Sequence, residues 1–209
     1  MTGHMASGLA ALALAAALPA AAQDIGPGLE ATQGQAGVLL VEPVAETIVT
    51  SLPETPLFWR VERFGGLAEA KAAGGPLSLA AEAWGAAWLV TLGPKGAVSP
   101  GARPLAEVGP VPIPKARRFR LRLNRAGGPP GAKTPVHTHP GSEAFYVLKG
   151  QLTQKSAHGE AVLEAGRAMN GHGPGMVMQL TSSGGEDLEQ LVMFVVDADK
   201  PFSEPARFD

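Results

Sequence analysis

Cysteine is absent from the 209 residues of this chain. Its absence excludes disulfide bonds, thiolate zinc sites, cysteine nucleophiles and lipid attachment through cysteine. A basic excess is missing as well, because 17 Lys and Arg stand against 19 Asp and Glu and leave a net charge of −2. A protein that binds nucleic acid through its phosphates normally carries such an excess. We therefore expect no nucleic-acid partner, and any chemistry must use His, carboxylate, hydroxyl or Met side chains.

Glycine and proline, in contrast, are abundant, with 27 and 19 residues. This share indicates many turns but is too small for a low-complexity chain. The length suits one domain, alone or with an extension. A protein built of strands and turns is the interpretation that fits both observations.

The N-terminal residues have the pattern of a signal peptide. An uncharged run rich in Leu and Ala, from Leu9 to Leu18, is followed by Pro19 and by the small residues Ala20–Ala22. The run is too short to span a bilayer. Lys and Arg are absent before it, so a flexible Ala-rich tail is the alternative. We predict a signal peptide over residues 1–22 and a periplasmic or secreted protein, with no membrane anchor after processing because no cysteine can carry a lipid.

Residues 23–115 hold no motif that carries chemistry. Short apolar runs alternate with Gly, Pro and Glu over 23–56, which predicts a linker or arm with one or two edge strands. Further along we predict a strand at 57–61, a short helix at 67–73 and a hairpin or two strands over 78–92. The tryptophans of this region, which are Trp59, Trp84 and Trp88, are expected in the core.

A basic cluster follows. Residues 118–123 alternate Arg with Phe or Leu, which predicts a strand with Arg118, Arg120 and Arg122 on one face. This face either meets solvent or a partner subunit, or binds carboxylates or phosphates. The apolar residues on the other face, which are Phe119, Leu121 and Leu123, are predicted to point into the core.

The clearest signal is a pair of histidines followed by a glutamate. His137 and His139 lie two residues apart, so on an extended chain both side chains project to the same side, and Glu143 follows a Pro-Gly-Ser turn. Two imidazoles and a carboxylate that face one cavity can hold a divalent metal ion. With open coordination positions they match the arrangement used by non-haem Fe(II) oxygenases.

The spacing Gly131-x5-His137-x-His139-x3-Glu143-x6-Gly150 resembles the first motif of the cupin family at every position. The resemblance covers about residues 116–200. It implies an all-β fold, a double-stranded β-helix or jelly-roll barrel with a metal ion in its lumen, preceded here by an N-terminal mixed extension that contains the short helix.

The family's second motif is matched less well. Gly166 and the turn Gly173–Gly175 fit it, but the position of the third metal-binding histidine then holds Met178, and Ser182 takes the place of an asparagine. Two alternatives stay open for this ligand. His172 lies just before the turn and can supply a nitrogen from the neighbouring strand. Otherwise Met178 lines the site as a weak soft ligand or as an apolar wall.

The strand after Glu143 predicts which residues face the lumen. Alternation places Tyr146 on the opposite side from Glu143. His158 has the surroundings of a hairpin tip and is left out of the site. Methionines in the lumen would favour an apolar or aromatic ligand. The residues expected to line the lumen are Phe145, Val147, Met176 and Met178.

The chain is thereby divided into five predicted parts. We predict a signal peptide at 1–22, a linker or arm at 23–56, a β-rich extension packing on the barrel at 57–115, a cupin domain at 116–200 and a C-terminal tail at 201–209.

The signal-peptide pattern and the resemblance together predict an exported metal-binding cupin. The resemblance carries over His137, His139 and Glu143 as ligands, and His172 is the candidate from the neighbouring strand for the remaining position, with Met178 as the alternative. The first hypothesis is a metal-dependent enzyme of the dioxygenase type that acts on a small molecule. The alternative is a cupin that binds a small ligand or a metal without turnover, including copper in the periplasm. The expected cofactor is a divalent transition metal ion, Fe, Mn, Ni, Zn or Cu. A small-molecule ligand or substrate is the expected partner, and a homodimer is compatible with the resemblance.

Overall fold

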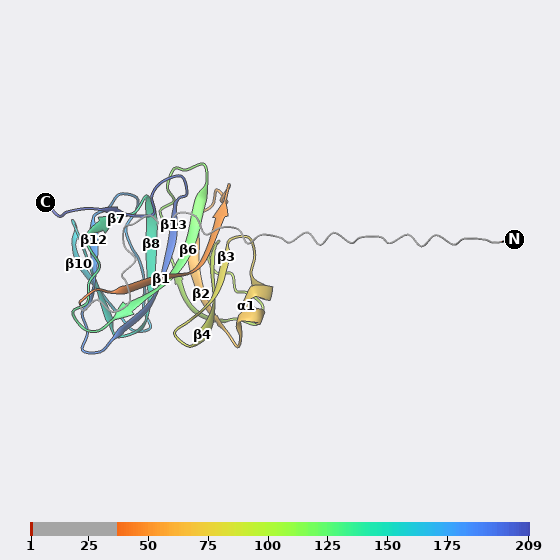
Figure 1. Cartoon of the computed structure of the whole chain (residues 1–209), viewed down its shortest axis with the longest axis horizontal. Coiled ribbons are helices and arrows are strands. Elements are labelled where there is room, and N and C mark those ends of the chain that lie inside the picture. Colours follow the sequence, from red (N-terminus) through yellow and green to blue (C-terminus); the bar gives the residue numbers. More distant parts are fainter. Residues whose placement is uncertain (2–36) are drawn as a thin grey trace.

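The computed structural model describes Met1 and residues 37–209. Its larger part is a barrel of two five-stranded antiparallel sheets that face each other (Figure 1). The first sheet has the order β1 (Leu40–Val49), β6 (Phe119–Gly128), β13 (Leu188–Asp197), β8 (Gly141–Lys149) and β11 (Ala168–Asn170). The second has the order β10 (Gly159–Glu164), β9 (Gln151–Ser156), β12 (Met178–Ser182), β7 (His137–Thr138) and β14 (Glu204–Pro205). The predicted all-β jelly-roll barrel is confirmed.

A third, smaller sheet forms another layer on the outer side of the first one (Figure 1). Its order is β3 (Ser78–Ala83), β4 (Ala86–Gly93), β2 (Phe58–Phe64) and β5 (Arg103–Val108), and the helix α1 (Leu67–Ala73) lies beside it. The predicted short helix and the hairpin over 78–92 are present at these positions. Because both faces of the first sheet are covered, its central strands carry long buried runs.

Strand alternation divides the apolar residues between two cores. Leu121 and Leu123 of β6 point away from the lumen, into the core shared with the third sheet. Tyr146 of β8 also lies in this outer core, where its ring meets the edge of Trp88 at a centroid distance of 6.4 Å. Phe145 points the opposite way, into the core inside the barrel. Tyr146 thus faces away from the lumen, as its position in the alternation predicts.

The arginines of β6 are paired within the chain. Glu46 of β1 forms ion pairs with both Arg120 and Arg122, and Glu42 pairs with Arg125. Because β1 lies directly beside β6, two glutamates of the arm partly neutralise these three arginines. Arg118, the first arginine of the predicted face, pairs instead with Asp199. The arginines of this face therefore form ion pairs within the chain.

Segments near both ends of residues 37–209 form edge strands of the barrel. The arm predicted for 23–56 supplies β1, which is an edge strand of the first sheet. The predicted tail supplies β14, the edge strand of the second sheet. No helix among the described residues is long and apolar enough to cross a membrane. The signal peptide predicted for 1–22 falls on residues outside the described ones.

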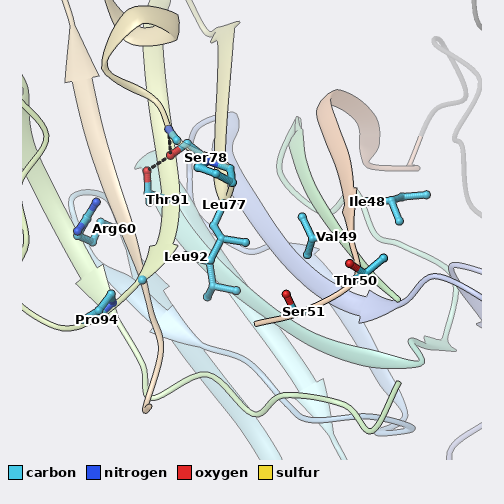
Figure 2. Close-up of a pocket in the computed structure, with 13 residues that line it drawn as sticks. Ile48, Val49, Thr50, Ser51, Arg60, Leu77, Ser78, Thr91, Leu92 and Pro94 are labelled. Carbon is cyan, nitrogen blue, oxygen red and sulfur yellow. Dashed lines mark hydrogen bonds between the residues drawn. The ribbon is translucent and has the colours of Figure 1, made fainter. Parts of the chain in front are cut away.

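A cleft of about 570 Å³ lies where the end of β1 meets the third sheet (Figure 2). Apolar and hydroxyl side chains line it, and Ser78 and Thr91 share a hydrogen bond of 2.8 Å there. None of the histidines or glutamates of the predicted metal motif borders this cleft. We therefore place the candidate site in the barrel.

Candidate metal centre

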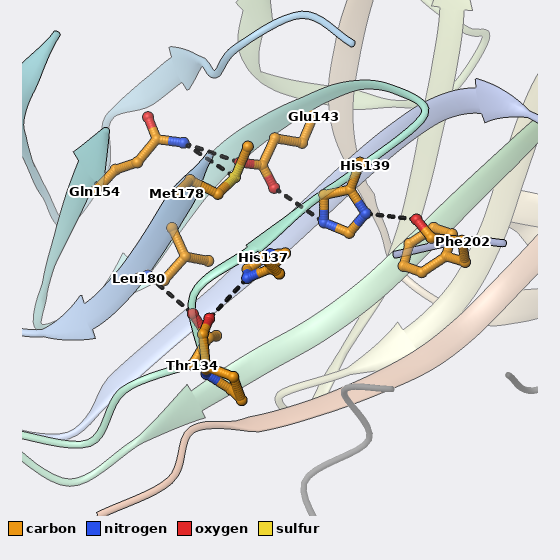
Figure 3. A network of polar contacts seen from close by, with 9 residues as sticks. Thr134, His137, His139, Glu143, Gln154, Met178, Leu180 and Phe202 are labelled. Carbon is orange, nitrogen blue, oxygen red and sulfur yellow. Dashed lines mark hydrogen bonds and ion pairs between the residues drawn. The ribbon is translucent and has the colours of Figure 1, made fainter. Parts of the chain in front are cut away.

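The two histidines and the glutamate of the motif project into the same part of the barrel (Figure 3). His137 belongs to the short strand β7, and His139 follows one residue after that strand. Extended backbone places their rings on one side, with centroids 4.9 Å apart. Glu143 comes from β8 in the opposite sheet. His137, His139 and Glu143 are only 3%, 5% and 1% exposed.

Backbone carbonyls hold both imidazoles in one orientation. The Nδ1 atom of His137 lies 2.8 Å from the carbonyl oxygen of Pro135, and Nδ1 of His139 lies 2.7 Å from that of Phe202. A carbonyl oxygen can only accept a hydrogen bond, so each Nδ1 carries the proton and each Nε2 keeps its lone pair. This is the tautomer and the kind of anchoring that metal-binding histidines use.

Glu143 has one satisfied and one unsatisfied oxygen. Its Oε1 atom accepts a hydrogen bond of 2.9 Å from the side-chain amide of Gln154. Its Oε2 atom is buried without a hydrogen-bond partner, 3.9 Å from Nε2 of His139. A buried polar atom without a partner costs free energy, so a bound cation or hydrogen-bond donor at this oxygen would stabilise the site.

Burial makes the site electrically neutral when no ion is bound. It raises the pKa of Glu143 to about 8, against the weaker opposite effect of the Gln154 hydrogen bond. Burial likewise lowers the pKa of His139 to about 3, assisted by the neighbouring His137 and Arg122 and opposed by the bond to Phe202. The pKa of His137 is lowered too, chiefly by burial. At neutral pH the contact between His139 and Glu143 is therefore not an ion pair.

A family model matches the part of the chain that carries these residues. A model described as a cupin domain matches residues 127–169, which include both histidines and Glu143. The chain contains a cupin domain. No curated protein sequence matches the chain.

Several solved structures are similar to part of this chain. A cupin-like protein from Thermotoga maritima is 20% identical with a TM-score of 0.37, over 41% of this chain and 64% of that one. A cupin 2 conserved barrel domain protein from Salinispora arenicola is 19% identical with a TM-score of 0.34, over 38% and 65% of the two chains. A cupin family protein from Methanocaldococcus jannaschii is 17% identical with a TM-score of 0.34, over 36% and 70%. The chain thus spans just under two thirds of the first two structures.

The donors of the cupin domain fit a divalent metal ion by type. Two imidazole nitrogens with free lone pairs and one unpartnered carboxylate oxygen are the N and O ligands that Zn, Fe, Ni and Cu accept. In the described part of the chain, however, no three His, Asp or Glu side chains are grouped closely enough to surround one ion. The residues that would hold the ion are thus present, but their side chains do not converge on one point among the described residues.

Met178 lies beside these donors. It is buried on β12, directly across from His137 of β7 in the strand register. Its sulfur is 3.8 Å from the amide nitrogen of Gln154, the same nitrogen that donates to Glu143. Met178 therefore occupies the wall of the site at the place where the cupin motif has its third histidine.

His172 packs beside another histidine, a contact that the sequence did not predict. It follows β11 in the loop that leads to Gly175, and its half-buried ring packs beside that of His158, 5.9 Å away between centroids. No strand pairing fixes the side to which a loop residue points, which is why the sequence did not place it. Among the residues predicted to line the lumen, Phe145 and Val147 lie in the barrel core, whereas Met176 is half-buried in the same loop as His172.

Two residues of the site were missed from sequence. Gln154 holds the carboxylate, and its polar side chain at an inward position between Leu152 and Ser156 was a signal that could have identified it. Phe202 accepts the hydrogen bond from His139, yet nothing in the sequence marks it, since it acts through its backbone carbonyl from outside the motif.

Proposed function

We propose that this cupin domain binds one divalent transition metal ion with His137, His139 and Glu143. The observation that carries the proposal is the buried, unpartnered Oε2 of Glu143 facing the free Nε2 of His139. A cation between them would repay the cost of burying the carboxylate and would keep it ionised. Fe, Mn, Ni, Zn and Cu all accept these donors, and the thioether of Met178 makes the site softer than one suited to Mg²⁺.

Three protein donors leave coordination positions open. An ion held by two histidines and one carboxylate would supply Lewis acidity or oxygen activation at those positions. Phe145 and Val147, which share the inward side of β8 with Glu143, contribute apolar side chains to the barrel interior beside the site. We propose that the site serves a small, largely apolar substrate, and that an ion held by His137, His139 and Glu143 would supply oxygen activation of the kind that oxygenases use.

Binding without turnover is the second candidate function. A specific observation favours it: the ring of Phe202 packs against His139 and Phe194, with centroid distances of 4.9 Å to each. A ligand histidine held between packed rings has little freedom to move, which suits a resident ion better than a ligand set that rearranges during turnover. Oxygen uptake by the Fe(II)-loaded protein with a panel of aromatic and enol compounds distinguishes the two. Uptake with any compound supports the enzyme, and silence across the panel supports the binder.

Metal binding itself is tested by titrating the purified protein with Co²⁺, Fe²⁺, Mn²⁺, Ni²⁺, Zn²⁺ and Cu²⁺. We expect one ion per chain, with affinity lost in His137→Ala and in Glu143→Gln. His158→Ala is the matched control, because it removes an imidazole outside the motif, and it should bind as the wild type does. Failure of the wild type to bind any of these ions would overturn the proposal, as would equal losses in the control.

We also propose that the protein is exported and works in the periplasm or outside the cell. The uncharged Leu- and Ala-rich run and the following Ala20–Ala22 support this. N-terminal sequencing of the protein from its native cells should begin at Gln23. A protein that keeps Met1 and stays in the cytoplasmic fraction would contradict export.

A further inference from the structure

We propose that residues 201–208, here named the C-terminal strap, hold His139 in its metal-binding orientation, and that Phe202 is its positioning residue. This inference rests on the proposed metal site and adds a part of the chain that the motif does not contain. The strap joins the sheet that carries the two histidines, where its strand β14 pairs with β7, and the C-terminus lies on this side of the barrel (Figure 1). Its backbone and its side chains make separate contributions.

The backbone of the strap supports β7. Pro205 lies opposite His137 and Glu204 opposite Thr138 in the strand register. The amide of Ala206 donates a hydrogen bond of 3.0 Å to the carbonyl of Val136. On its other side β7 pairs with β12 only at His137. A strand of two residues has little pairing of its own, so the strap supplies much of what keeps this histidine strand extended.

Phe202 fixes the ring of His139 on two sides (Figure 3). Its carbonyl oxygen is the hydrogen-bond partner of Nδ1 of His139, at 2.7 Å. Its own ring packs against the ring of His139 at 4.9 Å and lies under the guanidinium of Arg122 at 4.1 Å. Arg122 in turn is held by Glu46. The hydrogen bond selects the tautomer, and the packed rings prevent the imidazole from turning away.

The strap also forms a wall of the approach to the site. A cleft of about 670 Å³ reaches His139 from outside, and Pro201 and Glu204 lie along it, together with Lys115 and Pro174 from other parts of the chain. Movement of the strap would therefore loosen the ligand and widen this approach at the same time. For this reason we assign it a role in the site and not in folding alone.

The test compares three variants of the full chain. Phe202→Ala removes the ring, and Ala206→Pro removes the hydrogen bond to Val136 without touching the barrel core. Phe208→Ala is the matched control, since that ring lies over Lys155, 4.9 Å from its ammonium group. Partners that orient a metal-binding histidine typically contribute about 10- to 100-fold in affinity. We expect the first two variants to lose at least about tenfold in Co²⁺ affinity and the control to stay within about twofold.

Nitrogen-15 NMR of the imidazoles reports which ring nitrogen of His139 carries the proton. A variant that only lowers folding stability would not change this tautomer. In the metal-free wild type, His139 should be a single tautomer with its proton on Nδ1. Phe202→Ala keeps the carbonyl oxygen but loses the ring that packs the strap against His139 and Arg122, and Ala206→Pro loses the hydrogen bond to Val136. In both variants the strap should move away from His139, so the imidazole should exchange between tautomers, whereas Phe202→Tyr, which keeps the ring, should keep the single form. Ala206→Pro keeps the test available should Phe202→Ala fail to fold.

The outcomes separate this inference from the proposed function. A wild type that binds metal, with strap variants that bind as tightly and keep the single tautomer, overturns the inference alone. A wild type that binds no ion overturns the proposed function, and the tautomer of His139 in the metal-free variants then decides the role of the strap. Loss of both affinity and tautomer in the first two variants, with an unchanged control, supports the strap.

Discussion

Replacing Glu143 with Gln should stabilise the metal-free protein, and increasingly so as the pH rises. Burial raises the pKa of Glu143 from 4.5 to about 8. Between these values the folded chain must hold a proton that the unfolded chain releases, so folding loses stability as the pH increases. Gln carries no such proton, and its amide oxygen can still accept the hydrogen bond that Gln154 donates to Oε1.

The size of the effect follows from the linkage relation. One bound proton changes the free energy of unfolding by about 1.4 kcal/mol per pH unit. From pH 5 to pH 7.5 the wild type should therefore lose about 3 kcal/mol that Glu143→Gln keeps. The lowered pKa values of His137 and His139 act in the opposite direction, since they cost stability as the pH falls below 6.5. Both proteins share that effect, so it cancels in the difference.

Urea unfolding of EDTA-treated protein at the two pH values measures this difference. Glu164→Gln, on the exposed side of β10, serves as the control and should differ from the wild type by the same amount at both pH values. A Glu143→Gln advantage that does not grow between pH 5 and pH 7.5 would refute the argument that the buried carboxyl is held protonated.

Three further predictions follow from the packing of the site. A Cβ added at Gly171 would lie 2.8 Å from Cγ of Glu143, so Gly171→Ala should displace the carboxylate. A Co²⁺ titration should then show an affinity at least about tenfold weaker, which is about 1.4 kcal/mol. Gly185→Ala is the control, because a Cβ at Gly185 meets no atom within 4 Å, and this variant should bind Co²⁺ as the wild type does. Met178→His should add a third nitrogen donor, and a fourth ligand in all, beside His137 and tighten Zn²⁺ binding, which isothermal titration calorimetry would detect; unchanged affinity would mean that this side chain does not reach the ion. Trp88→Phe removes the indole hydrogen bond to Ala83, 2.8 Å long, and should lower the free energy of unfolding by about 1–3 kcal/mol in urea, with no effect on metal uptake.

The parts of the site that follow from strand alternation could be predicted. Given that His137 and His139 lie on extended chain, their rings must share a side, and the same rule separates Phe145 from Tyr146. The resemblance to the spacing of the cupin motif predicted that Glu143 joins the two histidines and that a β-barrel surrounds them. These elements need only local geometry, which a sequence carries directly.

Contacts between distant segments could not be predicted in this way. The pairing of Glu46 with Arg120 and Arg122 depends on β1 lying beside β6, whereas the alternation alone left that face to solvent, a partner subunit or anions. The place of His172 depends on a loop, where no alternation applies. The hydrogen bond from His139 to Phe202 spans the barrel mouth and uses a backbone atom that every residue type possesses.

The most direct test of the metal centre is a crystal structure of the protein soaked with Zn²⁺ or Co²⁺, with diffraction data collected at the absorption edge of the metal. We predict one anomalous peak in the barrel, about 2.0–2.2 Å from Nε2 of His137, Nε2 of His139 and Oε2 of Glu143. A barrel without a peak, or a peak only between His158 and His172, would contradict the proposed site.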